Sequence, residues 1–385
     1  MTDDIGHPLL LRVDCDEPFV SVTLSDGRRA RLHPLWLRDN CACSSCRHPR
    51  TWERVFDTVA IDPSLQMATA KMAPGRDGVG MALYIEWPDG HRSEYSAAWL
   101  SDHLPDQRRA WLTPGATTLW GSELLGSMPR CNFRTLHDGS CLLEFLESLQ
   151  EFGVTIVDHT PPTAEALADL ADQVGTRRAT NFGPHFEVVA MVQPNNNAYT
   201  AIELYPHSDL PNWEAPPGIQ FLHCLVAEAP GGESVLVDGF AIADSLRRDD
   251  PAAFELLRTT AFPYRFNDAT DDIRWRSPII HLDANGDYHE IRYHTGLAAP
   301  LDCDPDQMEA VYLAYIEFGR RARSAEFQVR FRLEEGEVMV FHNRRVLHGR
   351  AAFDPAGGCR HLRGCYVDAD DLRSRIRTMR GDNLR

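Results

Sequence analysis

The chain has no hydrophobic run that approaches the ~20 residues needed to cross a bilayer. Its first residues, Met1 to Asp4, are acidic and lack the basic and apolar segments of a secretory signal. We therefore expect a cytoplasmic protein with no membrane partner. Positive charge is also scarce, because 39 Lys and Arg residues face 56 Asp and Glu residues and leave a formal net charge of −17. This balance argues against nucleic acid as the main partner, since phosphate backbones bind basic surfaces.

Internal repeats are also missing, and 385 residues suffice for two domains with a sizeable core. We do not expect the ten cysteines to form the disulfide framework of a small secreted domain, because the chain is long. Several cysteines lie singly in apolar stretches, where a small buried side chain is the expected role (Cys141, Cys224 and Cys365). Three others form a cluster.

The pattern of the chain changes twice. Residues 1–104 favour short strands and turns, such as the alternating run 19–24 that ends at Asp26-Gly27. Residues 105–129 are poorly patterned and predict a connector. Residues 130–385 predict strands flanked by a few helices. We expect a mainly β protein with helices: a small β-rich N-terminal domain, the connector, and a catalytic domain folded as a double-stranded β-helix, or jelly roll.

Helical spacing of apolar residues predicts a helix over 136–152, a second helix capped by Thr163 and ended by Gly175, and a third from Asp304. Apolar runs predict strands in the following ranges: 154–157, 219–226, 234–237, 279–282, 327–333, 338–341 and 361–367.

His207-Ser208-Asp209 and His348 carry the most chemical information. Residues i and i+2 of an extended strand point to the same side, so His207 and Asp209 could present two metal ligands together. His348 follows the apolar strand-like run 338–341 closely. Two imidazoles and one carboxylate form the facial triad of non-heme Fe(II) oxygenases, which leaves three adjacent coordination positions open.

Arg360 follows His348 by twelve residues. In oxygenases with such a triad, an arginine at about this spacing binds the distal carboxylate of a keto-diacid co-substrate. A guanidinium suits that role because its planar fork matches a planar anion.

The cysteine cluster is Cys41-Ala42-Cys43-Ser44-Ser45-Cys46. Three thiolates and one imidazole make a closed tetrahedral zinc site, which stabilises a module with little core. The candidates for the fourth ligand are His33, His48, His91 and His103, and His91 is preferred because it lies at a predicted hairpin end. The alternative is three unrelated reduced cysteines on a loop.

Segments across nearly the whole chain resemble the gamma-butyrobetaine dioxygenase-like family of Fe(II)/2-oxoglutarate-dependent oxygenases. The N-terminal segments that match are Trp36-Leu37-Arg38-Asp39-Asn40-Cys41-x-Cys43-x-x-Cys46 and Trp87-Pro88-Asp89-x-His91. Later matches include Asn195-Asn196-x-Ala198-Tyr199-Thr200, Gly231-Gly232-x-Ser234, Leu347-His348-Gly349-Arg350 and Arg360-His361-Leu362. The resemblance implies a jelly-roll dioxygenase that uses Fe(II), 2-oxoglutarate and O2, carries structural zinc, forms a homodimer and hydroxylates a small trimethylammonium compound.

The resemblance also assigns roles to individual residues. It makes His207, Asp209 and His348 the iron ligands, and Arg360 the partner of 2-oxoglutarate with Ser234 beside it. Tyr199 and Tyr366 match an aromatic cage for the quaternary ammonium, which binds π faces because it cannot donate a strong hydrogen bond. Asn196 matches a residue that orients the substrate.

Two departures from the family pattern affect the substrate. Phe182 and Phe186 take cage positions usually held by Tyr and Trp, and His294-Thr295 takes the place of an asparagine pair near the substrate carboxylate. Arg292 precedes that pair. A histidine and a hydroxyl beside a guanidinium suit a tetrahedral anion. The family that the chain resembles has a branch that hydroxylates 2-(trimethylammonio)ethylphosphonate, and these departures narrowly favour that substrate, with hydroxylation at the carbon next to phosphorus.

Three alternatives remain. One is hydroxylation of gamma-butyrobetaine to carnitine, and another is oxidation of a different small anion, such as a sulfonate or trimethyllysine. The third, from a different class, is a non-enzymatic zinc-dependent interaction protein that uses the jelly roll as a scaffold.

Overall fold

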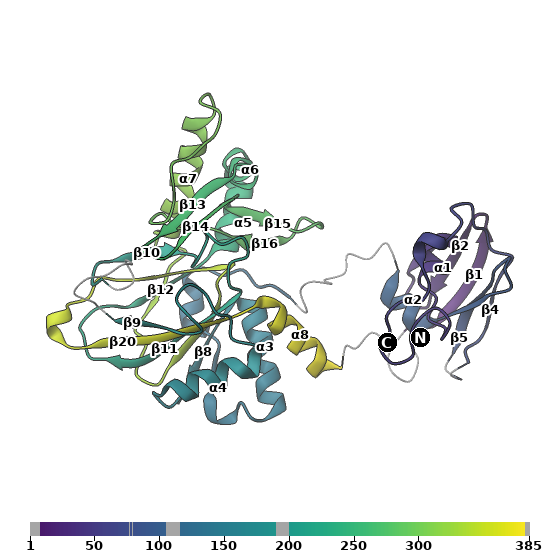
Figure 1. Ribbon diagram of the computed structural model, residues 1–385, viewed down its shortest axis with the longest axis horizontal. Helices are drawn as coiled ribbons and strands as arrows, with labels where there is room; N and C mark the ends of the chain where they lie inside the picture. Colours follow the sequence, from purple (N-terminus) through teal and green to yellow (C-terminus); the bar gives the residue numbers. More distant parts are fainter. Residues whose placement is uncertain (1–7, 77, 79, 105–115, 190–199, 382–385) are drawn as a thin grey trace. The chain divides into compact units, whose positions relative to one another are not determined.

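The computed structural model describes residues 8–76, 78, 80–104, 116–189 and 200–381. The chain forms two compact units, one within residues 1–109 and the other within residues 110–384 (Figure 1). Among the described residues, no helix has both the length and the apolar composition to cross a bilayer.

The described part of the first unit contains two antiparallel three-stranded sheets, ordered β1-β2-β3 and β4-β5-β6. Their strands are β1 (Leu10–Asp16), β2 (Phe19–Leu24), β3 (Arg29–Leu32), β4 (Thr69–Pro74), β5 (Met81–Glu86) and β6 (Arg92–Ser96). Short helices α1 (Pro34–Asp39) and α2 (Ala97–His103) follow β3 and β6. Every second residue of β2 is buried, and these side chains share one core with Leu83 and Ile85 of β5. Alternation along the strand therefore produces one apolar face, as the sequence pattern predicts.

The second unit is built on two sheets. One has the order β7-β8-β18-β11-β20-β9, and the other has the order β10-β19-β12-β17. The first contains β7 (Arg130–Asn132), β8 (Val154–Asp158), β18 (Val338–His342), β11 (Ile219–Ala227), β20 (Arg360–Val367) and β9 (Phe186–Val189). The second contains β10 (Leu204–His207), β19 (Val346–Arg350), β12 (Ser234–Asp238) and β17 (Val329–Phe331).

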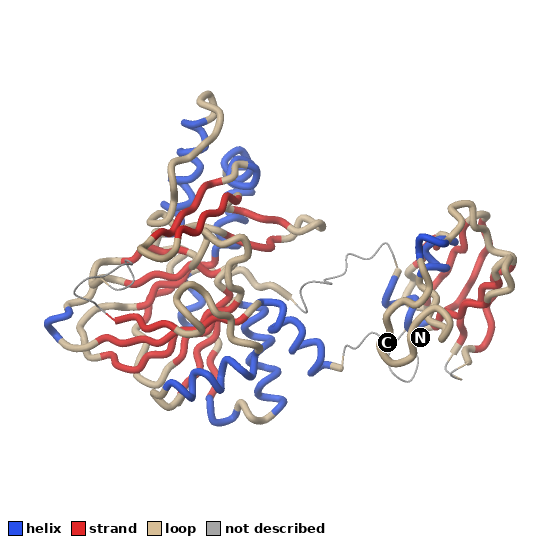
Figure 2. Tube along the Cα trace, in the orientation of Figure 1, coloured by secondary structure: helices blue, strands red, loops and turns tan. Residues whose placement is uncertain are grey.

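The side chains of β11 alternate between the two faces of its sheet. Ile219 and Phe221 pack beneath helices α3 (Gly139–Phe152), α4 (Ala164–Val174) and α8 (Ala369–Arg380). Leu222 packs on the other face against Leu236 of the four-stranded sheet. Figure 2 shows these three helices in blue below the red strands of the second unit. The two sheets thus enclose a shared interior, as expected for a jelly roll.

A segment between β12 and β17 adds helices and hairpins around a core of its own. It contains α5 (Gly239–Asp249), α6 (Pro251–Thr259), β13 (Phe262–Asn267), β14 (Asp272–Ser277), β15 (Ile280–Leu282), β16 (Tyr288–Ile291) and α7 (Met308–Ala322). Helices α5 and α6 and the β13–β14 hairpin were not predicted from the sequence.

The predicted helices form with small changes at their ends. Helix α3 starts at Gly139, capped by Asp138, and ends at Gly153, whose φ of 74° is in the left-handed region that favours glycine. Helix α7 starts four residues later than Asp304, because Gln307 and Met308 donate to Asp304 and Pro305 in a preceding turn. Part of the predicted connector packs into the second unit, where Trp120 and Leu124 are buried.

Candidate active site

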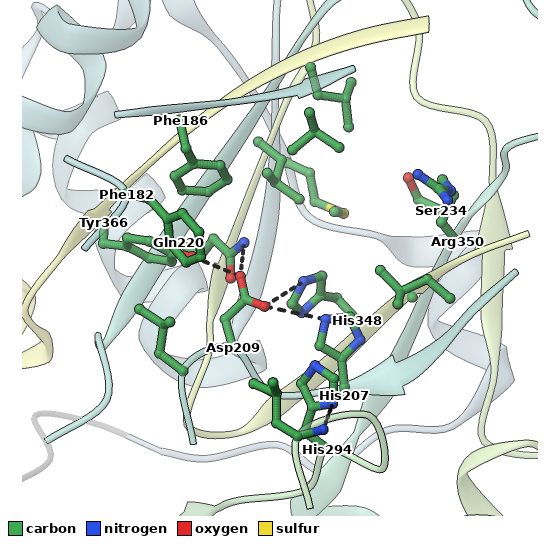
Figure 3. A pocket seen from close by; sticks show the side chains of 18 of the residues that line it. Phe182, Phe186, His207, Asp209, Gln220, Ser234, His294, His348, Arg350 and Tyr366 are labelled. Atoms are coloured by element: carbon green, nitrogen blue, oxygen red, sulfur yellow. Dashed lines mark hydrogen bonds and ion pairs between the residues drawn. The ribbon is translucent and has the colours of Figure 1, made fainter. Parts of the chain in front are cut away.

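Strands β10 and β19, together with the bend that follows β10, bring three ligating side chains together (Figure 3). His207 and His348 are directly opposite each other in this antiparallel pair, with ring centroids 4.3 Å apart. The Oδ1 atom of Asp209 lies 3.3 Å from Nε2 of His207 and 3.7 Å from Nε2 of His348. Two nitrogens and one oxygen therefore face a common point.

The local backbone differs from the expectation that His207 and Asp209 share one face of a strand. That expectation is wrong, because β10 ends at His207 and Asp209 lies in a bend. The next residue, Leu210, has a φ of 53°, in a region that non-glycine residues rarely adopt. Asn343 fixes this bend: it accepts from the Asp209 N–H at 2.7 Å and donates to the Asp209 carbonyl at 3.0 Å.

The protonation states of this cluster suit metal binding. Burial alone would raise the pKa of Asp209, but His348, His207 and a hydrogen bond from Tyr366 hold it well below its ordinary value. Burial and the nearby His207 lower the pKa of His348 to about 3. The Nδ1 atom of His207 lies 2.8 Å from the carbonyl oxygen of Tyr205, so Nδ1–H donates a hydrogen bond to this oxygen, and Nε2 is the ring nitrogen that faces the other two side chains.

The three ligating atoms lie within 4.8 Å of one another. One carboxylate and two neutral imidazoles are the donor set of the facial triad that binds Fe(II) and leaves three adjacent positions open. His207 and His348 are buried, so water has little access to the protein side of the site. The residues present therefore fit a non-heme iron.

One wall of the adjoining cavity is aromatic. The rings of Phe186 and Tyr366 are stacked with centroids 5.0 Å apart, and Phe182 meets Phe266 edge to face at 5.5 Å. Figure 3 shows Phe182, Phe186 and Tyr366 grouped on the side of Asp209. Phe266, on β13, was not predicted to contribute to the site. Such a wall offers π faces and few hydrogen-bonding groups, which suits a quaternary ammonium.

Another part of the cavity lining carries Ser234, Arg350 and Arg360. Figure 3 places Ser234 beside Arg350, away from the aromatic wall. Burial and the nearby Arg360 lower the pKa of Arg350 to about 10, so both guanidinium groups remain cationic at neutral pH. Arg350 also donates to the carbonyls of Thr200 at 2.7 Å and Ile202 at 2.8 Å. Arg360 and Ser234, with the charge of Arg350 beside them, therefore match the distal carboxylate of a keto-diacid.

His294 also lines the cavity, with its ring centroid 4.5 Å from that of His207. Its Nδ1 accepts from the backbone N–H groups of Gly296 at 3.0 Å and Leu297 at 3.2 Å. Burial and the nearby His207 hold the pKa of His294 well below its ordinary value, so the ring is neutral. Because Nδ1 accepts, the proton is on Nε2, and His294 offers one fixed donor.

Two residues predicted near the substrate do not line the cavity. Arg292 is buried, and its guanidinium binds Glu290 and donates to the carbonyls of Trp213 at 2.8 Å and Glu214 at 2.9 Å. The guanidinium of Arg292 therefore holds the backbone at Trp213 and Glu214, and it does not bind a substrate anion. Thr295 is exposed and outside the cavity lining.

Two further predicted residues, Asn196 and Tyr199, lie outside the described residues.

In the first unit, the predicted zinc ligands lie together. The Nε2 atom of His91 is 3.3 Å from Sγ of Cys41, 3.7 Å from that of Cys43 and 3.6 Å from that of Cys46. His91 follows the turn after β5, as its predicted place at a hairpin end implies. Three thiols and one imidazole close a tetrahedral set, which fits structural zinc and leaves no position for catalysis.

Arg38 belongs to the surroundings of this zinc site. Its Nη1 donates to Sγ of Cys46 at 3.2 Å, and its guanidinium lies over the ring of Phe56 at 3.9 Å. Arg38 is buried. A zinc ion with three thiolates carries a net negative charge, so a buried guanidinium balances it.

The fold and the cluster of His207, Asp209 and His348 together define a class. Two sheets that enclose a 2-His-1-carboxylate site with basic residues in the cavity are those of a jelly-roll non-heme iron oxygenase. Residues 112–366 match the family described as "Taurine catabolism dioxygenase TauD, TfdA family". Residues 11–101 match the family "Gamma-butyrobetaine hydroxylase-like, N-terminal".

Relatives that align over most of the chain support the same family. The chain is 42% identical over 359 residues to a gamma-butyrobetaine dioxygenase of Pseudomonas sp. (strain AK-1), covering 93% of this chain and 92% of that protein. It is 31% identical over 366 residues to the gamma-butyrobetaine dioxygenase of Homo sapiens, covering 91% of each. It is 30% identical over 359 residues to the mitochondrial trimethyllysine dioxygenase of Bos taurus, covering 91% of this chain and 83% of that protein.

The chain belongs to the TauD/TfdA family, in its branch with a gamma-butyrobetaine hydroxylase-like N-terminal module. It is an Fe(II)/2-oxoglutarate-dependent dioxygenase, and its N-terminal Cys3His site suits zinc. This confirms the predicted family, fold class, enzyme class and cofactors. The non-enzymatic alternative loses its support.

Proposed function

We propose that the enzyme hydroxylates a small trimethylammonium zwitterion, with gamma-butyrobetaine as the leading substrate and carnitine as the product. The observation that carries this proposal is the aromatic wall of Phe182, Phe186, Phe266 and Tyr366 in the same cavity as the ligands of the iron. A desolvated π face stabilises a quaternary ammonium by roughly 0.5–2 kcal/mol. The names of the relatives support the same substrate class.

The overall reaction is substrate C–H plus O2 plus 2-oxoglutarate giving substrate C–OH plus succinate plus CO2. Fe(II), when bound, supplies the redox chemistry that couples decarboxylation of 2-oxoglutarate to oxygen insertion. The residues of the chain supply geometry: Arg360 and Ser234, with Arg350 beside them, bind the co-substrate carboxylate, and the aromatic wall holds the cation. Fixing both partners selects which carbon faces the metal.

The anionic end of the substrate is assigned to His294, whose Nε2–H is a neutral donor held in one tautomer by Gly296 and Leu297. A single neutral donor suits a singly charged carboxylate. A phosphonate would call for a guanidinium beside this group, but Arg292 is already bound by Glu290 and two carbonyls. Gamma-butyrobetaine is therefore placed first.

2-(Trimethylammonio)ethylphosphonate remains the second candidate. His294 in place of an amide favours it, because the imidazole changes the anion site away from the family pattern.

A substrate panel tests the proposal. Succinate and hydroxylated product are measured by mass spectrometry for gamma-butyrobetaine, 2-(trimethylammonio)ethylphosphonate and trimethyllysine, with 4-aminobutyrate as the control that lacks the methyl groups. We expect the highest kcat/KM for gamma-butyrobetaine, at least about tenfold above 4-aminobutyrate, because a primary ammonium loses more hydration in an aromatic wall. Equal turnover of 4-aminobutyrate would contradict the assignment of the wall. A higher kcat/KM for the phosphonate would move the enzyme to the second candidate.

The homodimer and the cytoplasmic location implied at the outset stay predictions, and analytical ultracentrifugation checks the first.

A further inference from the structure

Two cavity-lining side chains bind the iron ligand Asp209 on the oxygen that faces away from the histidines. The hydroxyl of Tyr366 donates to Oδ2 of Asp209 at 2.8 Å, and Nε2 of Gln220 donates to the same oxygen at 2.8 Å. Oδ1 is the oxygen closest to Nε2 of His207 and His348. The two oxygens of one carboxylate thus have different partners.

Gln220 and Tyr366 act from neighbouring strands in register. They are directly opposite each other in the antiparallel pair of β11 and β20. Both are buried, at 1% and 3% exposure. Side chains that face each other across a pair lie about 4.5–5.5 Å apart at Cβ, so they can hold one oxygen from two directions.

The ring of Tyr366 belongs to the aromatic wall at the same time. It is stacked on Phe186 with an interplanar angle of 30°, and both rings line the cavity. Phe186 in turn fits against Gly364, where an added Cβ would lie 2.4 Å from the ring. The ring of Tyr366 is thus set by its stacking while its hydroxyl reaches the metal ligand.

We propose that Gln220 and Tyr366 are positioning residues that turn Oδ1 of Asp209 toward the metal, and that Tyr366 couples occupancy of the aromatic wall to the metal site. With Oδ2 bound by two donors, the carboxylate offers one oxygen to a metal, and the remaining positions stay open. A cation on the ring face restrains Tyr366, which restrains the hydroxyl and so the carboxylate. The coupling rests on the proposed function, whereas the orientation of Asp209 does not.

Reciprocal binding provides the test, because two coupled sites change each other's affinity by the same factor. Mn(II) replaces iron as a redox-inert probe in zinc-replete protein, and its Kd is measured by electron paramagnetic resonance with and without gamma-butyrobetaine. In the wild type we expect gamma-butyrobetaine to tighten Mn(II) binding about fivefold. We call the ratio of the Mn(II) Kd values without and with gamma-butyrobetaine the linkage factor. Tyr366→Phe keeps the ring and loses the hydroxyl, so this variant should still bind gamma-butyrobetaine, while its linkage factor falls below about twofold.

The orientation of Asp209 is measured without any substrate. Tyr366→Phe and Gln220→Leu should each weaken Mn(II) binding about tenfold, in the range usual for groups that orient a metal ligand. Tyr315→Phe is the matched control, because its buried hydroxyl has no hydrogen-bond partner among the described residues. Thermal unfolding checks that all variants are folded.

The outcomes separate the claims. If the wild type does not bind gamma-butyrobetaine, the proposed function fails, and the coupling fails with it. If the wild type binds and Tyr366→Phe shows the same linkage factor, the coupling alone is wrong. Unchanged Mn(II) affinity in both Tyr366→Phe and Gln220→Leu would overturn the positioning role. A role in folding alone would lower the unfolding temperature and leave the linkage factor unchanged.

Discussion

Asn343 is the residue on which the placement of Asp209 most depends, and Asn343→Ala is the perturbation that tests it. The side chain is fully buried at 0% exposure, directly after β18. It accepts from the Asp209 N–H at 2.7 Å and donates to the carbonyls of Asp209 at 3.0 Å and Pro217 at 3.1 Å. Alanine removes three hydrogen bonds and leaves three backbone groups without this partner.

The size of the effect follows from these contacts. A buried polar group that loses its partner costs about 1–3 kcal/mol, so three losses at the lower end sum to about 3 kcal/mol. Asn343→Ala should therefore lower the free energy of unfolding of the second unit by about 3 kcal/mol or more. Because the bend that carries Asp209 loosens, Mn(II) affinity should also fall about tenfold.

Urea unfolding and Mn(II) titration of zinc-replete protein measure both effects. Asn285→Ala is the matched control, since Asn285 is exposed in the β15–β16 turn and should change stability by less than about 0.5 kcal/mol. A loss below about 1 kcal/mol in Asn343→Ala, with unchanged Mn(II) affinity, would refute the role of Asn343 in holding the ligand.

Three further predictions concern separate parts of the molecule. Gly364→Ala places a Cβ 2.4 Å from the Phe186 ring, so the ring must move within the aromatic wall. Steady-state kinetics should show a KM for gamma-butyrobetaine raised about tenfold and an unchanged KM for 2-oxoglutarate. Parallel changes in both KM values would contradict this prediction. Arg38→Met removes the donor that lies 3.2 Å from Sγ of Cys46. Zinc release from this variant to a chromogenic chelator should be about tenfold faster than from the wild type, and release from Arg38→Lys should be intermediate. Equal release rates would contradict the proposed role of Arg38 in balancing the charge of the zinc site. Burial lowers the pKa of His223 from 6.5 to about 4. The unfolded chain therefore takes up a proton that the folded chain does not bind, and about 2–3 kcal/mol of stability, present above pH 6.5, is lost as pH falls toward 4. Urea unfolding of His223→Met should show a smaller loss across this range, and an unchanged slope would refute it.

The sequence was sufficient for the parts of the fold that depend on local pattern. Apolar runs predicted β11, β12 and β18, and the predicted cap Thr163 stands where α4 begins. The insertion between β12 and β17 was missed in part, because α5 and α6 are short and take their stability from packing against β15 and α7.

The site shows the same division. Arg350 could have been found from sequence, since it is two residues after His348 on one strand and so faces the same side. Gln220 could not, because its partnership with Tyr366 depends on the register of two strands about 140 residues apart in sequence. Arg292 was assigned to the anion site because a guanidinium attracts anions. In the structure, the carboxylate of Glu290, two residues earlier in the chain, already pairs with this guanidinium.

Metal stoichiometry together with turnover tests the central claim most directly. Wild-type protein and the His348→Ala variant are loaded with Fe(II), desalted anaerobically and analysed for iron and zinc, and succinate formation is measured beside them. The account predicts one iron and one zinc per chain in the wild type, and loss of iron and succinate formation with zinc retained in His348→Ala. A variant that keeps its full iron content and forms succinate at the wild-type rate would contradict the assignment of His207, Asp209 and His348 as the iron site.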